Sequence, residues 1–208
     1  MTICDSWLSL PFRRWKCSAR WTAGLFFLLV VVIPAHADEF DTLRQYWWNS
    51  MTGGSNSSAS TLASRASSAN TYWTSMITTN GRLCLWSDLP LGTKSANLSS
   101  TFNRLKTMAL AWTSPGCSLE GDTNLAAAVT GGLDWRATNI YPPTLASGSQ
   151  YDNWWDWQIG GPQAFNDTVV LMYSGLSDVE ITNYCGSIDH YSAPTKALMT
   201  GANLTDQC

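Results

Sequence analysis

Three tryptophans and two aspartates crowd the segment YDNWWDWQIGG at residues 151–161, which carries no basic residue. Asp152 and Asp156 are four positions apart, so on a helix they would share one face. Two carboxylates held ~5–9 Å apart are the arrangement that glycoside hydrolysis uses. The same spacing also suits a helix cap or a solvated helix face, since aspartate favours helix starts. Both interpretations are open from the sequence, and we favour the structural one.

The tryptophans of this segment cannot all point the same way on a regular element. Trp154 and Trp157 fall on one helical face, whereas Trp155 lies about 100° away. At least one indole is therefore expected to be exposed or to line a groove. An indole offers a flat apolar surface and an N–H donor, which suit the C–H face and the hydroxyls of a sugar ring. On residue types alone, sugar stacking and core packing are equally open.

Other catalytic motifs are missing from the sequence. HExxH, GxSxG, P-loop and dinucleotide-binding patterns do not occur, and no CxxC pair offers a start for a zinc site. These absences argue against nucleotide, serine-hydrolase and metalloprotease chemistry. We expect no metal and no cofactor, and we interpret His190 as a helix-terminal residue bonded to local backbone.

The first 37 residues have the pattern of a secretory leader. A positively charged region contains Arg13, Arg14, Lys16 and Arg20, residues 23–33 are apolar, and residues 34–37 end in a small-x-small cleavage site. The apolar run is roughly half of what a membrane span needs. We therefore expect a secreted, extracellular protein whose mature domain is 38–208, with no membrane partner after cleavage of 1–37.

The mature chain would be acidic. Cleavage would leave 8 basic and 14 acidic residues, a net charge of −6. Such a surface lacks the basic stripe that phosphate binding requires, so no nucleic-acid partner is expected. Cys84, Cys117, Cys185 and Cys208 would remain, and an even count in an exported protein predicts two disulfide bridges in one of three pairings.

Helical periodicity dominates the mature chain. Apolar residues recur at three- and four-residue intervals within 40–51, 62–76, 95–112, 124–135, 164–173 and 178–188. Residues 82–92 have no sustained period and are expected to form an ordered loop. Strand alternation is almost absent. About seven helices of roughly 10–18 residues predict an all-α chain, arranged as a bundle or a ring of helical hairpins.

Several segments together resemble one known family. They are DEFDTLRQYWWNSMTGG, LWSDLPLG with the following SANLSSTFNRLKTMALAW, GLDW, NWWDWQIGGPQAFND, IDH and TGAN. Taken in this order, they are similar to the N-terminal helical domain of the family 8 polysaccharide lyases, the secreted hyaluronate, chondroitin and xanthan lyases. The likeness covers 38–203. It implies an incomplete α/α toroid of helical hairpins that lacks the family's C-terminal β-sandwich domains, and we expect a monomer.

The resemblance also implies roles for individual residues. Trp154 and Trp155 match an aromatic patch that orients an acidic polysaccharide, and Asn153 and Arg104 match positions that line the same cleft. Asn203 matches the catalytic residue that neutralises the substrate's carboxylate. The implied reaction is β-elimination at a 4-linked uronic acid. A base removes the C5 proton, an amide stabilises the enolate-like charge, and an acid protonates the leaving oxygen.

The sequence departs from the family pattern near its end. The family's His and Tyr, which transfer the protons, lie downstream of the GAN segment, and this sequence ends five residues after Asn203. We therefore expect a lyase-like fragment that is inactive alone. Two alternatives stay open, a carbohydrate-binding module without catalysis and a glycoside hydrolase that uses Asp152 and Asp156. Only elimination would produce an ultraviolet-absorbing unsaturated uronate.

Overall fold

Six α-helices form the part of the chain that the computed structural model describes, residues 39–146 and 149–192. They are α1 (Glu39–Thr52), α2 (Ala59–Ser75), α3 (Ala96–Thr113), α4 (Thr123–Asn139), α5 (Gly161–Met172) and α6 (Asp178–Tyr191). Short 3₁₀ turns, η1 (Gly54–Asn56) and η3 (Tyr173–Gly175), follow α1 and α5, and a π-helical turn, η2 (Asp156–Gly160), leads directly into α5. No strand occurs within these ranges, which confirms the predicted all-α class. These ranges contain six of the about seven helices that the sequence predicts for the mature chain.

Several helices begin at side-chain caps that lie close by in the sequence. The Ser58 hydroxyl accepts a hydrogen bond from the Thr61 N–H at the start of α2. Asp122 Oδ1 accepts from two N–H groups of the first turn of α4, at 2.8 and 2.9 Å. Ser177 and Glu180 form a reciprocal capping box at the start of α6. Because these caps satisfy donors that the helix itself leaves unpaired, they fix where the helices begin.

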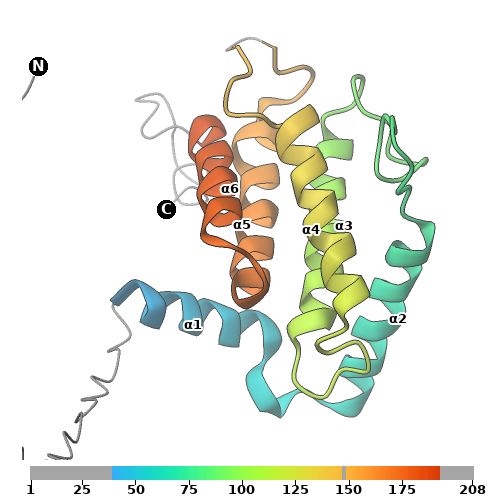
Figure 1. Cartoon of the computed structure of the whole chain (residues 1–208), viewed down its shortest axis with the longest axis vertical. Helices are drawn as coiled ribbons and strands as arrows, with labels where there is room; N and C mark the ends of the chain where they lie inside the picture. The colour runs from blue at the N-terminus through green and yellow to red at the C-terminus, as the bar shows by residue number, and fades with distance from the viewer. Residues whose placement is uncertain (1–38, 147–148, 193–208) are drawn as a thin grey trace, which may run out of the picture. The chain divides into compact units, whose positions relative to one another are not determined.

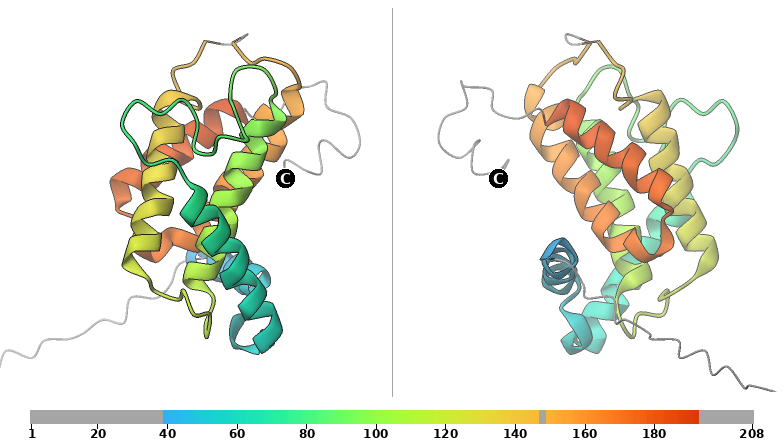
Figure 2. Two further views of the ribbon diagram at one scale, coloured as in Figure 1. Left: turned by 90° about the vertical axis from the view of Figure 1, so that its right-hand side faces the viewer. Right: turned by 60° about the vertical axis from the view of Figure 1, so that its left-hand side comes forward.

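The helices pack around α3, which has its most extensive contact with α5 and also touches α2 and α4 (Figure 1). α5 and α6 run side by side, and α4 packs against both α3 and α6 (Figure 2). α1 runs across the direction of the other five helices and touches α3 and α5. The loop before α3 and the segment before η2 lie at the same end of this helical array (Figures 1 and 2).

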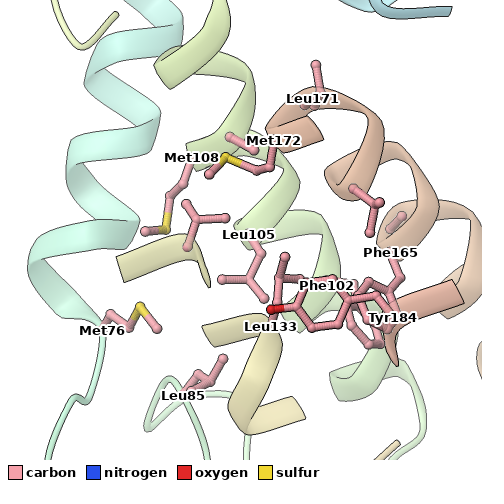
Figure 3. Close-up of a cluster of buried hydrophobic side chains, with 14 of the residues drawn as sticks. Met76, Leu85, Phe102, Leu105, Met108, Leu133, Phe165, Leu171, Met172 and Tyr184 are labelled. Carbon is pink, nitrogen blue, oxygen red and sulfur yellow. The ribbon is translucent and has the colours of Figure 1, made fainter. Parts of the chain in front are cut away.

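The core lies between α3, α4, α5 and α6. Its fully buried members include Phe102, Leu105, Met108, Leu133, Phe165 and Tyr184 (Figure 3). The rings of Phe102 and Phe165 stack with their centroids 4.7 Å apart, which ties α3 to α5. The predicted ordered loop at 82–92 is confirmed, since Leu85 and Trp86 in it are buried and close one side of this core.

The outer face of α1 is more exposed than its apolar period suggests. Phe40, Leu43 and Tyr46 are largely exposed, although the predicted helix itself is confirmed. α1 contacts its neighbours through another face, where the Trp48 Nε1–H donates to the Thr113 hydroxyl at 2.9 Å. No helix in the described ranges is long and apolar enough to cross a membrane.

The prediction of two disulfide bridges is wrong. Cys84, Cys117 and Cys185 are free thiols, and any pairing of the four cysteines into two bridges would join two of these three. Cys117 is buried in the core, where it packs as a small apolar side chain. An even cysteine count carries no information about distance, whereas a bridge needs Cα atoms within about 7 Å of each other. Cys208, Asn203 and the leader predicted for 1–37 lie outside the described residues.

The central position of α3 can be tested by truncating one of its buried side chains. Leu105→Ala should lower the free energy of unfolding by about 2–5 kcal/mol, because it leaves a cavity against α4. Leu83→Ala, at a leucine that is 86% exposed, should change it by less than about 0.5 kcal/mol. Urea titrations of both variants measure the difference. Equal losses would show that α3 does not form the core.

Candidate functional site

The start of α3 is held by the tryptophan segment rather than by neighbouring residues. The Ser95 N–H donates to Asp152 Oδ2 at 3.0 Å, and the Ser95 hydroxyl donates to Asp156 Oδ2 at 2.7 Å. Asp156 Oδ1 accepts from the Ser99 hydroxyl at 2.5 Å. Negative charge at a helix N-terminus is also stabilised by the helix dipole. Asp152 and Asp156 therefore cap α3 from positions 57 and 61 residues further along the chain.

This arrangement favours the structural interpretation of the two aspartates over the glycosidase one. Asp156 is 6% exposed, and both of its oxygens already accept hydrogen bonds from hydroxyls. Asp152 adopts a φ of 64°, the left-handed region that a non-glycine residue rarely occupies. Its bond to Ser95 offsets the cost of that conformation. The pair has no space between its carboxylates for a sugar, because both contact the same hydroxyl.

Trp157 anchors the segment in the core. It is 2% exposed, and its Nε1–H donates to the Tyr151 carbonyl at 3.0 Å. Its own carbonyl accepts from the Tyr141 hydroxyl, and the rings of Tyr141 and Trp157 stack. Trp154 is 42% exposed, so the expectation that Trp154 and Trp157 share one face is wrong. The π-helical turn that begins at Asp156 changes the rotation per residue between them.

A hollow of about 240 Å³ opens beside Trp155 between α3 and α5. We call it the α3–α5 groove. Its walls are two helical rows, Ser99, Asn103 and Lys106 on α3, and Gly160, Gln163, Ala164 and Asp167 on η2 and α5, with Trp155 as the remaining residue of the lining. Lys106 Nζ lies 2.6 Å from Asp167 Oδ2.

The two exposed indoles confirm that at least one tryptophan of the segment faces solvent. Trp154 and Trp155 are 42% and 37% exposed. The ring of Trp155 lies directly against the backbone of Gly160, where a Cβ would be 2.2 Å from Trp155 Cζ3. Only glycine therefore allows this ring to lie against the start of α5. The geometry gives a flat indole surface next to polar groups, an arrangement that suits a sugar ring.

Asn153 supports the tandem tryptophans through its hydrogen bonds. Its Oδ1 accepts from the Trp155 N–H at 3.1 Å, and its own N–H donates to the Ser95 hydroxyl at 3.0 Å. The residue is exposed. Its Nδ2 group forms no hydrogen bond to any described residue, so both amide hydrogens are available to a ligand.

Arg104 lies on a different side of α3 from the groove. Its guanidinium group makes two hydrogen bonds to the Asp88 carboxylate, at 2.9 and 2.5 Å, and lies 5.0 Å from the ring centroid of Tyr72 and 5.3 Å from that of Trp86. The hydrogen bond from Arg104 holds the pKa of Asp88 below its ordinary value. The structure therefore does not bring Arg104 together with the α3–α5 groove, and its place in a substrate cleft stays a prediction.

His190 lies in the last turn of α6, as expected, but its partner is not local. Its Nε2 is 3.0 Å from the carbonyl of Leu145, on the loop after α4. The neighbouring Tyr191 is buried, and its hydroxyl donates to the Pro142 carbonyl. Within the described ranges, no three His, Cys, Asp or Glu side chains form a group that could hold a metal ion.

The sequence reasoning missed the polar lining of the groove and the two serines. Asn103 and Lys106 are three positions apart, and Gln163 and Asp167 are four apart, so helical spacing alone could have placed each pair on one face. The serine contacts carried no comparable signal, because Ser95 and Asp156 are far apart in the sequence.

Comparisons with known proteins agree with this fold. The family model described as polysaccharide lyase family 8, N-terminal alpha-helical domain, matches residues 48–208. A xanthan lyase of Bacillus sp. (strain GL1) is 40% identical over 176 residues, 81% of this chain and 18% of that protein. A hyaluronate lyase of Thermasporomyces composti is 38% identical over 187 residues, 87% of this chain and 23% of that protein.

Solved structures show the same relationship. A Paenibacillus xanthan lyase has a TM-score of 0.76 at 40% identity, over 82% of this chain and 16% of that one. A Streptomyces coelicolor A3 chondroitin AC lyase, in complex with chondroitin sulphate, has a TM-score of 0.71 at 31% identity, over 83% of this chain and 24% of that one. The fold is thus that of the helical domain of a polysaccharide lyase. The chain belongs to polysaccharide lyase family 8, and it spans 16–24% of the length of these relatives.

The link between the tryptophan segment and α3 can be tested at its buried carboxylate. Asp156→Ala removes the buried carboxylate that accepts the shortest hydrogen bonds of the Ser95 and Ser99 hydroxyls and should lower the free energy of unfolding by about 2–3 kcal/mol. Asp189→Ala, at an exposed aspartate of α6, should change it by less than about 0.5 kcal/mol. Thermal and urea unfolding of the two variants provide the measurement, and equal stabilities would contradict the capping role.

Proposed function

We propose that this chain binds a uronic-acid-containing polysaccharide through Trp154 and Trp155, as the recognition part of a secreted, monomeric lyase of family 8. The observation that carries the proposal is the exposure of two adjacent indoles on a segment that Trp157 anchors in the core. Exposed apolar surface of this kind fits a ligand that stacks. The relatives named xanthan lyase and hyaluronate lyase support a polysaccharide as that ligand.

Within this proposal, two polar residues supply hydrogen-bond donors for a sugar, Asn153 beside the indoles and Arg104 on another side of α3. Asn153 offers its Nδ2 group, because its Oδ1 is used by the Trp155 N–H. Arg104 has five N–H donors, of which two bond Asp88, so the others can reach a carboxylate or a hydroxyl. Both residues therefore keep donors for substrate while they hold their present contacts.

Within this proposal the chemistry is β-elimination, with Asn203 as the amide that stabilises charge on the substrate's carboxylate. A base takes the C5 proton, the electrons of that bond form the C4=C5 double bond, and the leaving O4 oxygen gains a proton. A neutral amide favours this step because it hydrogen-bonds the carboxylate as negative charge develops there. The product carries a conjugated, ultraviolet-absorbing uronate.

Truncating the two exposed indoles tests the binding face. Trp154→Ala and Trp155→Ala should each weaken binding of a hyaluronate hexasaccharide by about 1–3 kcal/mol, the usual loss for a stacked aromatic anchor. Tyr46→Ala, at an exposed aromatic residue of α1, is the matched control and should leave the affinity unchanged. Isothermal titration calorimetry measures all three.

A second variant moves the ring of Trp155 without removing it. Gly160→Ala puts a methyl group into the space that the indole occupies, so it should also weaken binding. Gly131→Ala, whose methyl group would meet nothing within 4 Å, is its control. If both tryptophan variants bind as the unaltered protein does, the indoles are not a sugar platform.

We also expect the 208-residue chain to bind polysaccharide without cleaving it. After residue 37 its one histidine is His190, which contacts the Leu145 carbonyl, and the adjacent Tyr191 hydroxyl bonds Pro142. Loss of a proton-transfer group costs ~10²–10⁴ in rate, so turnover should stay near background. Absorbance of the unsaturated uronate measures it with hyaluronate, chondroitin and xanthan. A rate that rises with protein concentration and disappears in Asn203→Ala would contradict this expectation. It would show that the chain does catalyse elimination, with His190 or Tyr191 as the first candidates for proton transfer.

A further inference from the structure

We propose that the α3–α5 groove is a subsite for an uncharged sugar residue of the polysaccharide, and that Lys106 and Asp167 together form hydrogen bonds with its hydroxyls. This inference rests on the proposed function, because it extends the binding face of Trp155 along α3. It gives Asn103, Lys106 and Asp167 a role in binding an uncharged sugar residue.

The charges of the groove compensate each other. Lys106 Nζ and Asp167 Oδ2 are 2.6 Å apart, and among the residues that the structure describes they are the only charged ones in the lining. A carboxylate or sulfate that entered would gain the attraction of Lys106 but meet the repulsion of Asp167 at nearly the same distance. An anionic sugar therefore gains little net electrostatic free energy here.

The same pair suits two neighbouring hydroxyls. Asp167 Oδ1 can accept a hydrogen bond from one of them, and Lys106 Nζ, with three donors, can donate to the other while it keeps its bond to Asp167. Both side chains are held by their mutual contact, so little conformational entropy is lost when a sugar binds. Asn103 adds its Oδ1, since only its Nδ2 is used, by the Ser99 carbonyl.

The length of the groove and the presence of Trp155 in its lining suit an uncharged sugar residue. Ser99 and Lys106 are seven residues apart on α3, which places them about 10 Å apart along the helix axis. Trp155 also lines the groove, and its exposed indole can stack on the ring whose hydroxyls reach towards Lys106. A polymer that alternates uronate and neutral sugars would place a neutral residue here and a uronate beyond Trp155.

The test compares a charged ligand with its neutral analogue. The probes are a hyaluronate hexasaccharide and the same hexasaccharide with its carboxylates reduced to primary alcohols. Asp167→Asn should weaken binding of both probes, by about tenfold for the carboxyl-reduced one, which is the loss of one charge-assisted hydrogen bond. Asn103→Ala, at an exposed residue, should weaken both in the same way. Asp41→Asn, which breaks the comparable Arg44–Asp41 ion pair on α1, should change neither.

The outcomes separate the two proposals. If Asp167→Asn binds the acidic hexasaccharide more tightly and with a steeper salt dependence, Lys106 is a carboxylate receptor and the subsite is not one for a neutral sugar. If the tryptophan variants lose affinity while Asp167→Asn and Asn103→Ala do not, the groove is not a subsite and the proposed function stands. If the unaltered protein binds neither probe, the proposed function fails and the groove proposal with it. Thermal unfolding of each variant establishes that it is folded.

Discussion

The hydrogen bonds between Ser95 and the two aspartates join the central helix to the aromatic segment. α3 has no cap from its own sequence neighbours, and Asp152 and Asp156 supply one from the loop that carries Trp154 and Trp155. One contact thus stabilises the helix that organises the core and fixes the backbone that presents the indoles. Because Asp156 is buried and accepts from two hydroxyls, a shift of either element would leave a buried charge unsatisfied.

The local geometry that follows from this contact explains why the indoles are exposed. The π-helical turn closes with the Gly161 N–H donating to the Asp156 carbonyl, five residues back, and it turns Trp157 into the core. Gly160 then leaves room for the ring of Trp155. π-helical turns often mark functional sites, since an extra residue within a helix is otherwise costly. Exposed indoles held by a buried cap and a buried anchor form a preorganised surface, which limits the entropy lost on binding.

Much of the fold could be predicted from the sequence, because periodicity and caps are local signals. The six described helices match the six ranges of apolar periodicity, and the ordered loop at 82–92 was also predicted correctly. The errors concern information that is not local. The cysteine count could not reveal that Cys84, Cys117 and Cys185 lie unpaired, and a regular helical wheel could not anticipate the π-helical turn between Trp154 and Trp157.

The candidate site combines exposed aromatic surface with charges that are already paired. Lys106, which lines the groove with Trp155, is held by Asp167, and Arg104, on another side of α3, is held by Asp88, so each of these two positive charges has a carboxylate within hydrogen-bonding distance. An acidic polymer that approaches this face therefore meets little net attraction at long range, where paired charges cancel. Its affinity must come from stacking and from hydrogen bonds that form only after close contact. Such interactions depend on the shape and hydroxyl pattern of the sugar more than on its charge, and they act mainly on the rate of dissociation.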